Sequence, residues 1–436
     1  IVVPLRQSST KDMRQITIKR LLLLVGMMLA TVKAQAQGAV AFDQYFEDST
    51  LRLDYVFAGN DKEQHIFFEQ AYVTTRWAGR KSRLAEMPLL GNGQIKLKDV
   101  TTGQLLFVHT FSTLFQEWQA TEEAKKVQKS FEASYNVPMP KQPVCVEVTL
   151  TDFHGKVIGE MTHMIDPKDI LIRHLGQNDI PYHYVWTADS VPALPRCLDL
   201  AIVAEGYTEA EMEKFDKDCQ RVVDALFAHE PFTSLKNRFN VVAVAPRSLD
   251  SGTSVPREGH WSRTPVGTHY DTFYSNRYLM TQDVHRLYDL LSDVPFEHII
   301  VLVNSAIYGG GGIYNQLLVT TTDHPTFRQV LVHEFGHSYG GLGDEYDYGD
   351  DPESMYPADT EPWEPNLTTK VDFERKWADM LPDPTGRIGL YEGGGYQSKG
   401  VWRPSKDCRM KTNEAKNFCP VCNRAIVRIT DFYTSH

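Results

Sequence analysis

The stretch His333-Glu334-Phe335-Gly336-His337 holds two histidines four residues apart, with a glutamate directly after the first. On an α-helix, residues four apart lie one turn apart on the same face, so both imidazole rings project to one side. Two neutral imidazoles placed in this way fill two corners of a tetrahedral zinc site. A glutamate beside the first histidine is then placed to take a proton from a water molecule on the zinc. The stretch therefore predicts a helix that carries His333 and His337 as zinc ligands and Glu334 as a general base.

The flanking residues predict where this helix begins and ends. Residues 326–332 lead into the motif without a helix breaker, and Asp323 and Pro325 stand where helices typically begin. Gly340 and Gly341 follow the motif, and glycine commonly ends a helix in a left-handed turn. We expect a sharp turn directly after the helix.

The third zinc ligand is expected just beyond this turn. In the metzincin arrangement the third ligand lies six residues after the second histidine, but that position is Gly343, which has no side chain. If the turn uses Gly341 rather than Gly340, the register slips by one residue and Asp344 becomes the third ligand. Glu345 is the alternative, because its longer side chain compensates in part for a second residue of slippage. We predict Asp344 as the ligand, with Glu345 turned outward or orienting a histidine.

The stretch from His333 to Tyr346 resembles the signature of the IgA-cleaving metallo-endopeptidase family. Shorter segments share the resemblance, two of them in an amino-terminal domain of that family: Ala204-Glu205-Gly206-Tyr207-Thr208, Glu392-Gly393-Gly394-Gly395-Tyr396, Cys408-Arg409-Met410, Phe418-Cys419-Pro420-Val421-Cys422, Leu51-Arg52-Leu53-Asp54-Tyr55 and Phe115-Gln116-Glu117-Trp118. The resemblance covers most of the chain beyond its amino terminus. It implies a zinc endopeptidase, and it does not imply that immunoglobulin A is the substrate.

The length and composition indicate two globular domains. A chain of 436 residues is long for one domain, and 42% hydrophobic with 11% aromatic residues suits full cores. The net charge of −11 argues against a nucleic-acid partner, because contact with phosphate requires a basic face. A protein or peptide substrate remains, and the oligomeric state stays open.

The amino terminus has the features of an export signal. Four basic residues precede an apolar segment at 21–32, and Ala34-Gln35-Ala36 offers a small-residue cleavage site. We expect residues 1–36 to be a signal peptide with an upstream extension before Met13. The apolar segment is too short to span a bilayer, so we expect no membrane span and a periplasmic, cell-surface or secreted protein.

Export permits disulfide bonds between the six cysteines. Cys419 and Cys422 form a C-x-x-C pair, but a zinc ribbon needs a second pair and Cys408 supplies one residue. We therefore expect a disulfide from Cys408 to Cys419 or Cys422.

The chain divides into two halves with different patterns. Residues 37–170 contain short alternating segments separated by turns, which predicts an antiparallel β-sandwich with a helical insertion near residues 121–135. This half holds no catalytic constellation, so it is interpreted as a packing or substrate-presenting module. Residues 171–436 alternate between strands and helices, which predicts an α/β metzincin-like zinc peptidase domain.

Within the second half, apolar runs at 198–204, 239–245 and 298–303 predict buried strands. Thr208 and Glu211 form a capping box that opens a helix reaching about Ala228. Residues 314–321, after the flexible glycine run at 309–312, are expected to form the edge strand that binds an extended peptide by backbone pairing.

Further residues are candidates for roles around the zinc. Met410 is the candidate for the methionine that packs beneath the zinc in metzincins. Tyr346 and Tyr396 are each candidates to donate a hydrogen bond to the oxyanion of the intermediate. The loop at 246–280 is expected to rim the active site, and its three candidate ligands are interpreted as solvated loop residues: His260, His269 and Asp271.

The sequence thus favours an exported zinc endopeptidase that cleaves extended protein segments. Two alternatives stay open: a zinc amidase acting on cell-wall peptide, and a catalytically inactive binding protein on a peptidase scaffold. Intact His333, Glu334 and His337 argue against the inactive scaffold.

Overall fold

The computed structural model describes residues 40–188, 197–349 and 355–435. The expected signal peptide at residues 1–36 lies outside the described residues. Residues Ala41–His436 form one unit by their internal contacts, and every element below belongs to it.

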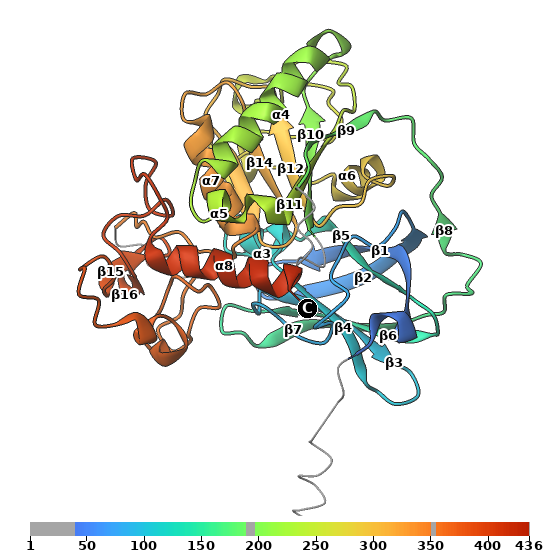
Figure 1. Cartoon of the computed structure of the whole chain (residues 1–436), viewed down its shortest axis with the longest axis horizontal. Coiled ribbons are helices and arrows are strands. Elements are labelled where there is room, and N and C mark those ends of the chain that lie inside the picture. The colour runs from blue at the N-terminus through green and yellow to red at the C-terminus, as the bar shows by residue number, and fades with distance from the viewer. Residues whose placement is uncertain (1–39, 189–196, 350–354, 436) are drawn as a thin grey trace, which may run out of the picture. The chain divides into compact units, whose positions relative to one another are not determined.

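The amino-terminal half is rich in strands and contains two four-stranded sheets (Figure 1). Their strand orders are β5-β1-β2-β8 and β4-β3-β6-β7. The strands are β1 (Phe46–Gly59), β2 (Gln64–Val73), β3 (Gly93–Asp99), β4 (Leu105–Phe111), β5 (Lys129–Pro140), β6 (Val144–Thr151), β7 (Val157–Ile165) and β8 (Arg173–His174), preceded by the short helix α2 (Phe42–Tyr45). Buried aromatic rings join the sheets, since Phe111 of β4 lies 6.3 Å from Phe57 of β1 and 4.1 Å from Tyr135 of β5, between ring centroids.

The helical insertion expected at residues 121–135 is wrong in position. The helix of this region is α3 (Leu114–Gln119), and Thr113 caps it by accepting a hydrogen bond from the Gln116 N–H at 3.0 Å. Residues from Lys129 onward belong to β5, which pairs antiparallel with β1. The buried side chains there repeat every second residue, at Phe131, Ala133, Tyr135 and Val137, which is the period of a strand.

The second half is built on a six-stranded mixed sheet with the order β13-β14-β12-β10-β11-β9. These strands are β9 (Tyr182–Trp186), β10 (Leu198–Glu205), β11 (Phe239–Val244), β12 (His298–Val303), β13 (Gly310–Ile313) and β14 (Leu317–Thr321). The four central strands run parallel, whereas β13 and β9 pair antiparallel at the two edges. The buried strands predicted at 198–204, 239–245 and 298–303 are confirmed.

Two helices cover one face of this sheet, α4 (Met212–Phe227) and α7 (Phe327–Ser338), and they contact each other (Figure 1). The predicted capping box is confirmed, because the Glu211 carboxylate accepts from the Thr208 N–H at 2.9 Å and from its hydroxyl at 2.8 Å. The remaining helices are α5 (Phe232–Leu235), α6 (Val284–Leu290) and α8 (Pro420–Thr434), and the hairpin of β15 (Tyr391–Gly394) and β16 (Gln397–Arg403) precedes α8. Short 3₁₀ turns complete the fold at η1 (Glu209–Glu211), η2 (Lys236–Arg238), η3 (Pro256–Glu258), η4 (Thr272–Tyr274), η5 (Phe373–Arg375) and η6 (Ala378–Met380).

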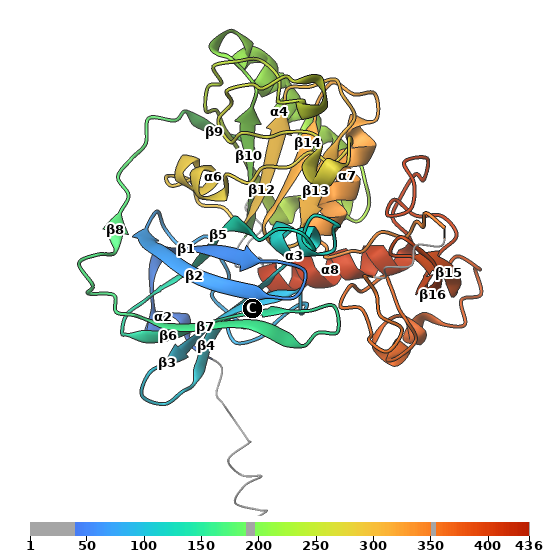
Figure 2. The same ribbon diagram turned by 180° about the vertical axis from the view of Figure 1, so that it is seen from behind.

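The end of α8 connects the two halves (Figure 2). The Asn315 side chain donates to the Thr110 carbonyl of β4 at 2.8 Å and to the Tyr433 hydroxyl of α8 at 3.1 Å. The Arg80 guanidinium lies 5.2 Å from the ring centroid of Phe432. These contacts hold the amino-terminal half against the second half, which is called the zinc-motif half after the motif at residues 333–337.

The prediction that residues 314–321 form the edge strand of the sheet is wrong. Residues 317–321 form β14, and the glycine run expected to be flexible forms the edge strand β13 outside it, with Gly312 opposite Leu318. The absence of side chains is what lets β13 lie against α7, because a Cβ on Gly312 would stand 2.5 Å from the Glu334 carbonyl oxygen.

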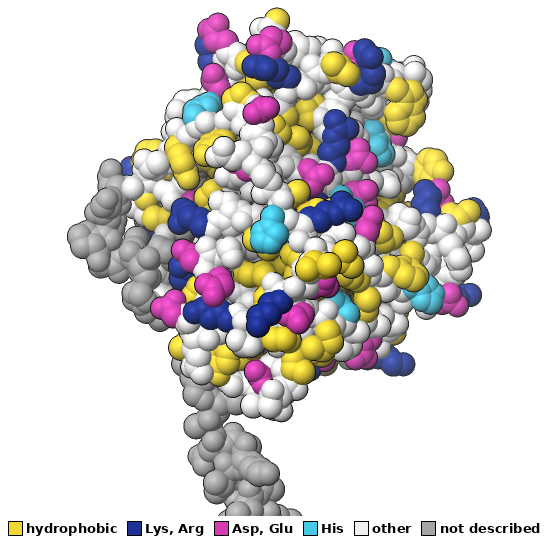
Figure 3. Space-filling view, turned by 90° about the vertical axis from the view of Figure 1, so that its right-hand side faces the viewer, with side chains coloured by type: hydrophobic (Ala, Val, Ile, Leu, Met, Phe, Trp, Pro, Cys, Tyr) yellow, Lys and Arg dark blue, Asp and Glu magenta, His cyan; other side chains and the backbone are white. Residues whose placement is uncertain are grey.

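Among the described residues no helix is both long and apolar enough to cross a membrane. On the face shown in Figure 3, basic and acidic side chains are interspersed with hydrophobic ones.

Candidate metal centre

Helix α7 presents His333 and His337 to the same side, with their Nε2 atoms 3.0 Å apart. The Nδ1 atom of His333 hydrogen-bonds to the Arg409 carbonyl at 2.9 Å, and that of His337 to the Leu342 carbonyl at 2.6 Å. A carbonyl oxygen only accepts, so each Nδ1 carries the proton and each neutral ring directs the lone pair of Nε2 at the other.

The turn after α7 uses Gly341, whose φ of 59° is left-handed. This turn brings the Leu342 carbonyl back to His337 and then directs Asp344 toward the histidines. The Asp344 Oδ1 atom lies 3.1 Å from Nε2 of His333 and 3.2 Å from Nε2 of His337. Glu345 points to the opposite side, where its Oε1 atom lies 3.1 Å from the Cys422 sulfur.

Three acceptor atoms therefore converge on one point, the two Nε2 atoms and Oδ1 of Asp344. In a tetrahedral zinc site with bonds of about 2.0–2.1 Å, neighbouring ligand atoms lie about 3.3 Å apart, which is close to the observed spacing. Lone pairs facing each other at this distance repel unless a cation lies between them. The donor set and its spacing fit a metal ion.

Protonation is the alternative to a metal at this point. Burial lowers the pKa of His337, but the adjacent Asp344 carboxylate outweighs it and raises the pKa to about 10. Burial raises the pKa of Asp344, but the two histidines hold it well below its usual range. A proton or a metal ion must occupy the space between these groups, and the negative charge of Asp344 favours either one.

Glu334 lies next to this triad, with a carboxylate oxygen within 4.8 Å of a nitrogen of each histidine. Burial raises the pKa of Glu334, and the two histidines oppose that shift. A carboxyl group with a raised pKa holds a proton more readily than an exposed one. β13 lies beside it, since a Cβ on Gly310 would stand 3.2 Å from Oε1 of Glu334.

The two candidate tyrosines lie on the Asp344 side of the triad. The Tyr396 hydroxyl donates to Oδ2 of Asp344 at 2.5 Å. The Tyr346 ring stacks along His333 with 6.4 Å between centroids and 21° between planes, and it faces the cleft. Burial, followed by the nearby Asp344 carboxylate, raises the pKa of Tyr346.

Backbone pairing places the segment Glu392-Gly393-Gly394-Gly395-Tyr396 beside the loop at residues 340–346, which is called the ligand loop because it carries the candidate ligand Asp344. The Gly395 N–H donates to the Asp344 carbonyl at 2.8 Å, and the Tyr396 N–H donates to the Tyr346 carbonyl at 3.0 Å. Tyr396 has a φ of 67°, which is uncommon for a tyrosine and concentrates at functional sites. The glycines thus let the chain pass close enough to deliver the tyrosine to Asp344.

A cleft of about 610 Å³ opens over the triad. Its wall includes residues from both halves of the chain: Asn92, Ser112, Glu117, Arg277, Tyr278, Gly310, Gly311, Gly312, His333, Glu334, His337, Asp344, Tyr346, Tyr348, Tyr356, Trp363, Glu364 and Tyr396. Asn92, Ser112 and Glu117 of the amino-terminal half line the cleft beside the triad, so this half forms part of the cleft wall.

Glu117 and Tyr278 are two of the cleft residues to which no sequence pattern assigns a role. Glu117 comes from α3, and it accepts a hydrogen bond from the Tyr278 hydroxyl in the loop at 246–280. Burial raises the pKa of Glu117 to about 7, and the bond from Tyr278 opposes that shift. The only sequence signal for Glu117 is the family resemblance of its segment, Phe115-Gln116-Glu117-Trp118.

The three candidate ligands in the loop at residues 246–280 contact other groups of that same loop and lie apart from the triad. Asp271 pairs with Arg257 at 2.8 Å, His260 with the Ser262 hydroxyl at 2.9 Å, and His269 with the Tyr270 carbonyl at 2.7 Å. The buried carboxylate of Glu205 holds this loop, since it accepts from the Thr264 hydroxyl at 2.5 Å and from two backbone N–H groups.

Met410 is fully buried beneath α7. A Cβ on Gly336, between the two histidines, would stand 2.6 Å from the Met410 sulfur, so this glycine and this methionine pack against each other. The backbone around Met410 also supports the site, because the Arg409 carbonyl binds His333 and the Met410 carbonyl accepts from the Glu345 N–H at 2.8 Å.

The disulfide expected at Cys408 is not formed. Cys408, Cys419 and Cys422 are all free, and the sulfurs of Cys408 and Cys422 lie 3.8 Å apart, whereas a disulfide bond is about 2.05 Å long.

Two family models match the chain. The model described as IgA Peptidase M64 matches residues 185–386 and 382–430, and the model described as Peptidase M64 N-terminus matches residues 41–162. No curated protein is significantly similar to the chain. The first model alone covers more than half of the chain, including α7 with its histidines and the ligand loop. The chain belongs to the IgA peptidase M64 family.

Proposed function

We propose that this peptidase is a zinc-dependent endopeptidase that hydrolyses extended protein segments. The observation that carries the proposal is the convergence of His333, His337 and Asp344 on one point at 3.0–3.2 Å, beside Glu334 and in an open cleft. Hydrolysis of a peptide bond needs an electrophilic centre, a proton acceptor and room for a chain, and the cleft supplies all three.

His333, His337 and Asp344 would hold the zinc ion, which supplies Lewis-acid chemistry that polarises a water molecule and the scissile carbonyl. Glu334 accepts the proton of the attacking water and returns it to the nitrogen of the leaving amine, acting first as base and then as acid. Its raised pKa suits both tasks.

The two tyrosines have different roles, one in positioning a ligand and one in donating a hydrogen bond to the oxyanion. Tyr396 is committed to Asp344 through its 2.5 Å hydrogen bond, so it positions a ligand. Both tyrosines line the cleft, but the Tyr346 ring stacks along His333, so Tyr346 is the better placed donor to the developing oxyanion.

The edge strand β13 supports an extended substrate. Gly310 is bridged to Tyr278 on its outer side. Residues two apart in a strand direct their backbone groups to the same side, so Gly312 presents its N–H and carbonyl beyond that bridge. A peptide that pairs there runs past Glu334 in extended form, which is the mode of β-strand addition. Exposed linkers should therefore be cut and folded segments should resist.

The Glu334→Gln variant tests the mechanism. It should keep the zinc and the fold and lose activity by about three orders of magnitude or more, because an amide cannot accept the proton. Glu414→Gln is the matched control, since Glu414 is an exposed carboxylate on the rim of the same cleft. Near-normal turnover of Glu334→Gln on a denatured protein substrate would eliminate the proposal.

Two alternatives are separated by substrate profiling. A zinc amidase would release cell-wall peptides and leave unfolded proteins intact, and an inactive scaffold would cleave neither. Cleavage-site mapping on a mixture of proteins should instead find internal cuts within extended segments.

Two further features belong to this proposal. We propose that the two sheets of residues 46–165 pack as a β-sandwich. We also propose that the zinc-motif half has the metzincin arrangement, in which a largely parallel sheet, the zinc helix and a buried methionine follow in order along the chain. We also propose export, and mass spectrometry of the exported protein should find an amino terminus close to Gln37. Retention of residues 21–32 in that protein would contradict the export signal.

A further inference from the structure

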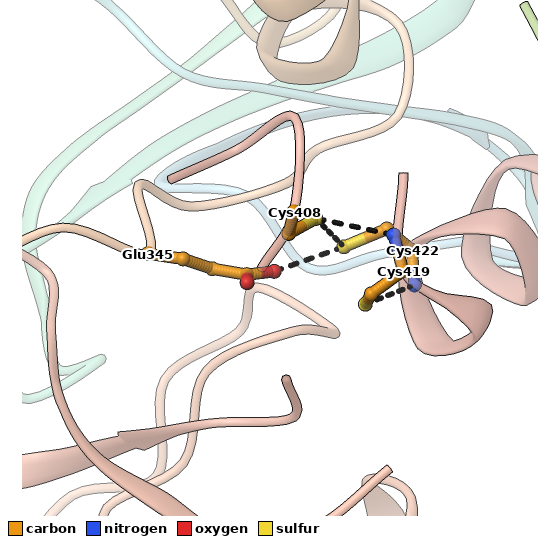
Figure 4. A group of neighbouring side chains, drawn as sticks. All are labelled: Glu345, Cys408, Cys419 and Cys422. Carbon is orange, nitrogen blue, oxygen red and sulfur yellow. Dashed lines mark hydrogen bonds between the residues drawn. The ribbon is translucent and has the colours of Figure 1, made fainter. Parts of the chain in front are cut away.

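Behind the ligand loop lies a second cluster of metal-binding side chains, drawn in Figure 4: Glu345, Cys408, Cys419 and Cys422. One carboxylate oxygen and three sulfur atoms lie within 4.8 Å of one another. Glu345 and the cysteines are buried, with at most 3% of any of these residues exposed. They come from three separate segments of the chain, so only the tertiary structure brings them together.

The geometry of the cluster matches a tetrahedral thiolate site. Zinc binds sulfur at about 2.3 Å, so two sulfurs in a tetrahedron lie about 3.8 Å apart. The sulfurs of Cys408 and Cys422 lie at 3.8 Å. The Oε1 atom of Glu345 lies 3.1 Å from the Cys422 sulfur, where about 3.5 Å is expected for a zinc-bound pair. A small outward shift of Glu345 would complete the tetrahedron.

The surroundings stabilise negative charge on this cluster. The Cys419 N–H donates to the Cys408 sulfur at 3.2 Å, and the Cys422 N–H donates to the Cys419 sulfur at 3.5 Å. Cys419 caps the start of α8, where the helix dipole favours an anion. Such N–H donors and helix termini are typical supports of metal-bound thiolates.

Outside the cluster, only one carboxylate oxygen of Glu345 has a hydrogen-bond partner among the described residues. Its Oε1 atom accepts from the Asn366 side chain at 3.0 Å, but its Oε2 atom has no hydrogen-bond partner among the described residues. A fully buried carboxylate with an unpaired oxygen is rare unless it is paired with a cation or binds a metal.

We propose that Glu345, Cys408, Cys419 and Cys422 bind a second, structural zinc ion. Four protein ligands close the coordination shell, so this site offers no open position for a substrate. Three thiolates select zinc over magnesium or calcium, which prefer oxygen ligands.

The second zinc ion would hold in place the two segments that position Asp344 and His333. Glu345 directly follows Asp344, and its N–H binds the Met410 carbonyl at 2.8 Å. Cys408 directly precedes Arg409, whose carbonyl orients His333 at 2.9 Å. One metal ion would therefore link the loop that carries Asp344, the segment whose Arg409 carbonyl binds His333, and the start of α8.

The test uses the full chain carrying His333→Ala and His337→Ala together, so that its result is independent of peptidase activity. Wild-type protein should hold about two zinc ions per chain by elemental analysis, and the double variant about one. Adding Cys408→Ser to the double variant should remove that remaining ion. Cys219→Ser is the matched control, because Cys219 is equally buried but lies in α4, and it should leave the ion in place.

Cobalt substitution gives a readout that does not depend on a cysteine variant folding. Cobalt bound in the His333→Ala, His337→Ala protein should show an intense thiolate-to-cobalt charge-transfer band. Cys408, Cys419 and Cys422 should also react as free thiols after denaturation with a chelator and without reductant. A double variant free of zinc and of the cobalt band, or a disulfide-linked peptide containing Cys408, would overturn the proposal.

Discussion

The hydrogen bond from Tyr396 to Asp344 gives a sharp test of how the candidate centre is built. The Tyr396→Phe substitution keeps the ring and removes the hydroxyl that donates to Oδ2 of Asp344 at 2.5 Å. Asp344 is nearly buried, with 5% of its side chain exposed, so water replaces the lost donor poorly. A hydrogen bond to a charged group contributes about 1.5–3 kcal/mol. We therefore expect zinc affinity to fall by about 10-fold to 100-fold, since about 1.4 kcal/mol corresponds to a factor of ten.

The matched comparison is Tyr346→Phe. Tyr346 stacks along His333 and also lies near Asp344, whereas Tyr396 makes the 2.5 Å hydrogen bond, so Tyr346→Phe should lower zinc affinity less than Tyr396→Phe does and lower kcat by about 10²–10³. Competition with a chromophoric chelator measures the affinity of each variant, and turnover of an unfolded protein substrate is measured with zinc in excess. Tyr396→Phe should recover most of its activity under excess zinc, whereas Tyr346→Phe should not. If Tyr396→Phe binds zinc normally yet stays slow, the assignment of the two tyrosines is reversed and the reasoning fails.

Three further predictions concern the ligand loop, the edge strand and the cleft. Asp344→Ala should lower the zinc affinity of the catalytic site far more than Glu345→Ala, because Asp344 reaches both Nε2 atoms; chelator competition showing the reverse order would refute the ligand assignment. Gly312→Ala should destabilise the fold by about 1–3 kcal/mol, because its Cβ would stand 2.5 Å from the Glu334 carbonyl; Gly176→Ala, which meets nothing within 4 Å, is the control in denaturant unfolding. Glu117 has a folded pKa of about 7, above its value in the unfolded chain, so wild-type stability should decline as the pH rises from about 4.5 through 7. Glu117→Gln should therefore raise the melting temperature of the zinc-free protein relative to wild type more at pH 8 than at pH 5, and an equal difference at both would contradict the buried carboxylate.

Local geometry explains which parts of this protein the sequence determined. Helix periodicity alone places His333 and His337 on one face, because residues four apart share a face in any α-helix. Both faces of a parallel strand are buried, so β10, β11 and β12 show continuous apolar runs that are visible in the sequence. The capping box at Thr208 joins residues three apart, so it is visible in the sequence as well. The left-handed turn at Gly341 was one of two registers that the sequence allowed, and it is the one that directs Asp344 to the histidines.

Contacts between distant segments explain what only the tertiary structure decided. The role of β13 as the edge strand depends on how closely α7 approaches it, which no local pattern encodes. Glu117 reaches the cleft because the amino-terminal half contacts the zinc-motif half, and its segment carries no catalytic pattern of its own. Cys408 lies in one cluster with Cys419, Cys422 and Glu345, and Glu345 is 63 residues earlier in the chain. These side chains gain their roles from contacts that form only when the chain folds. Contacts between residues far apart in the sequence follow no regular spacing, so the sequence alone does not predict them.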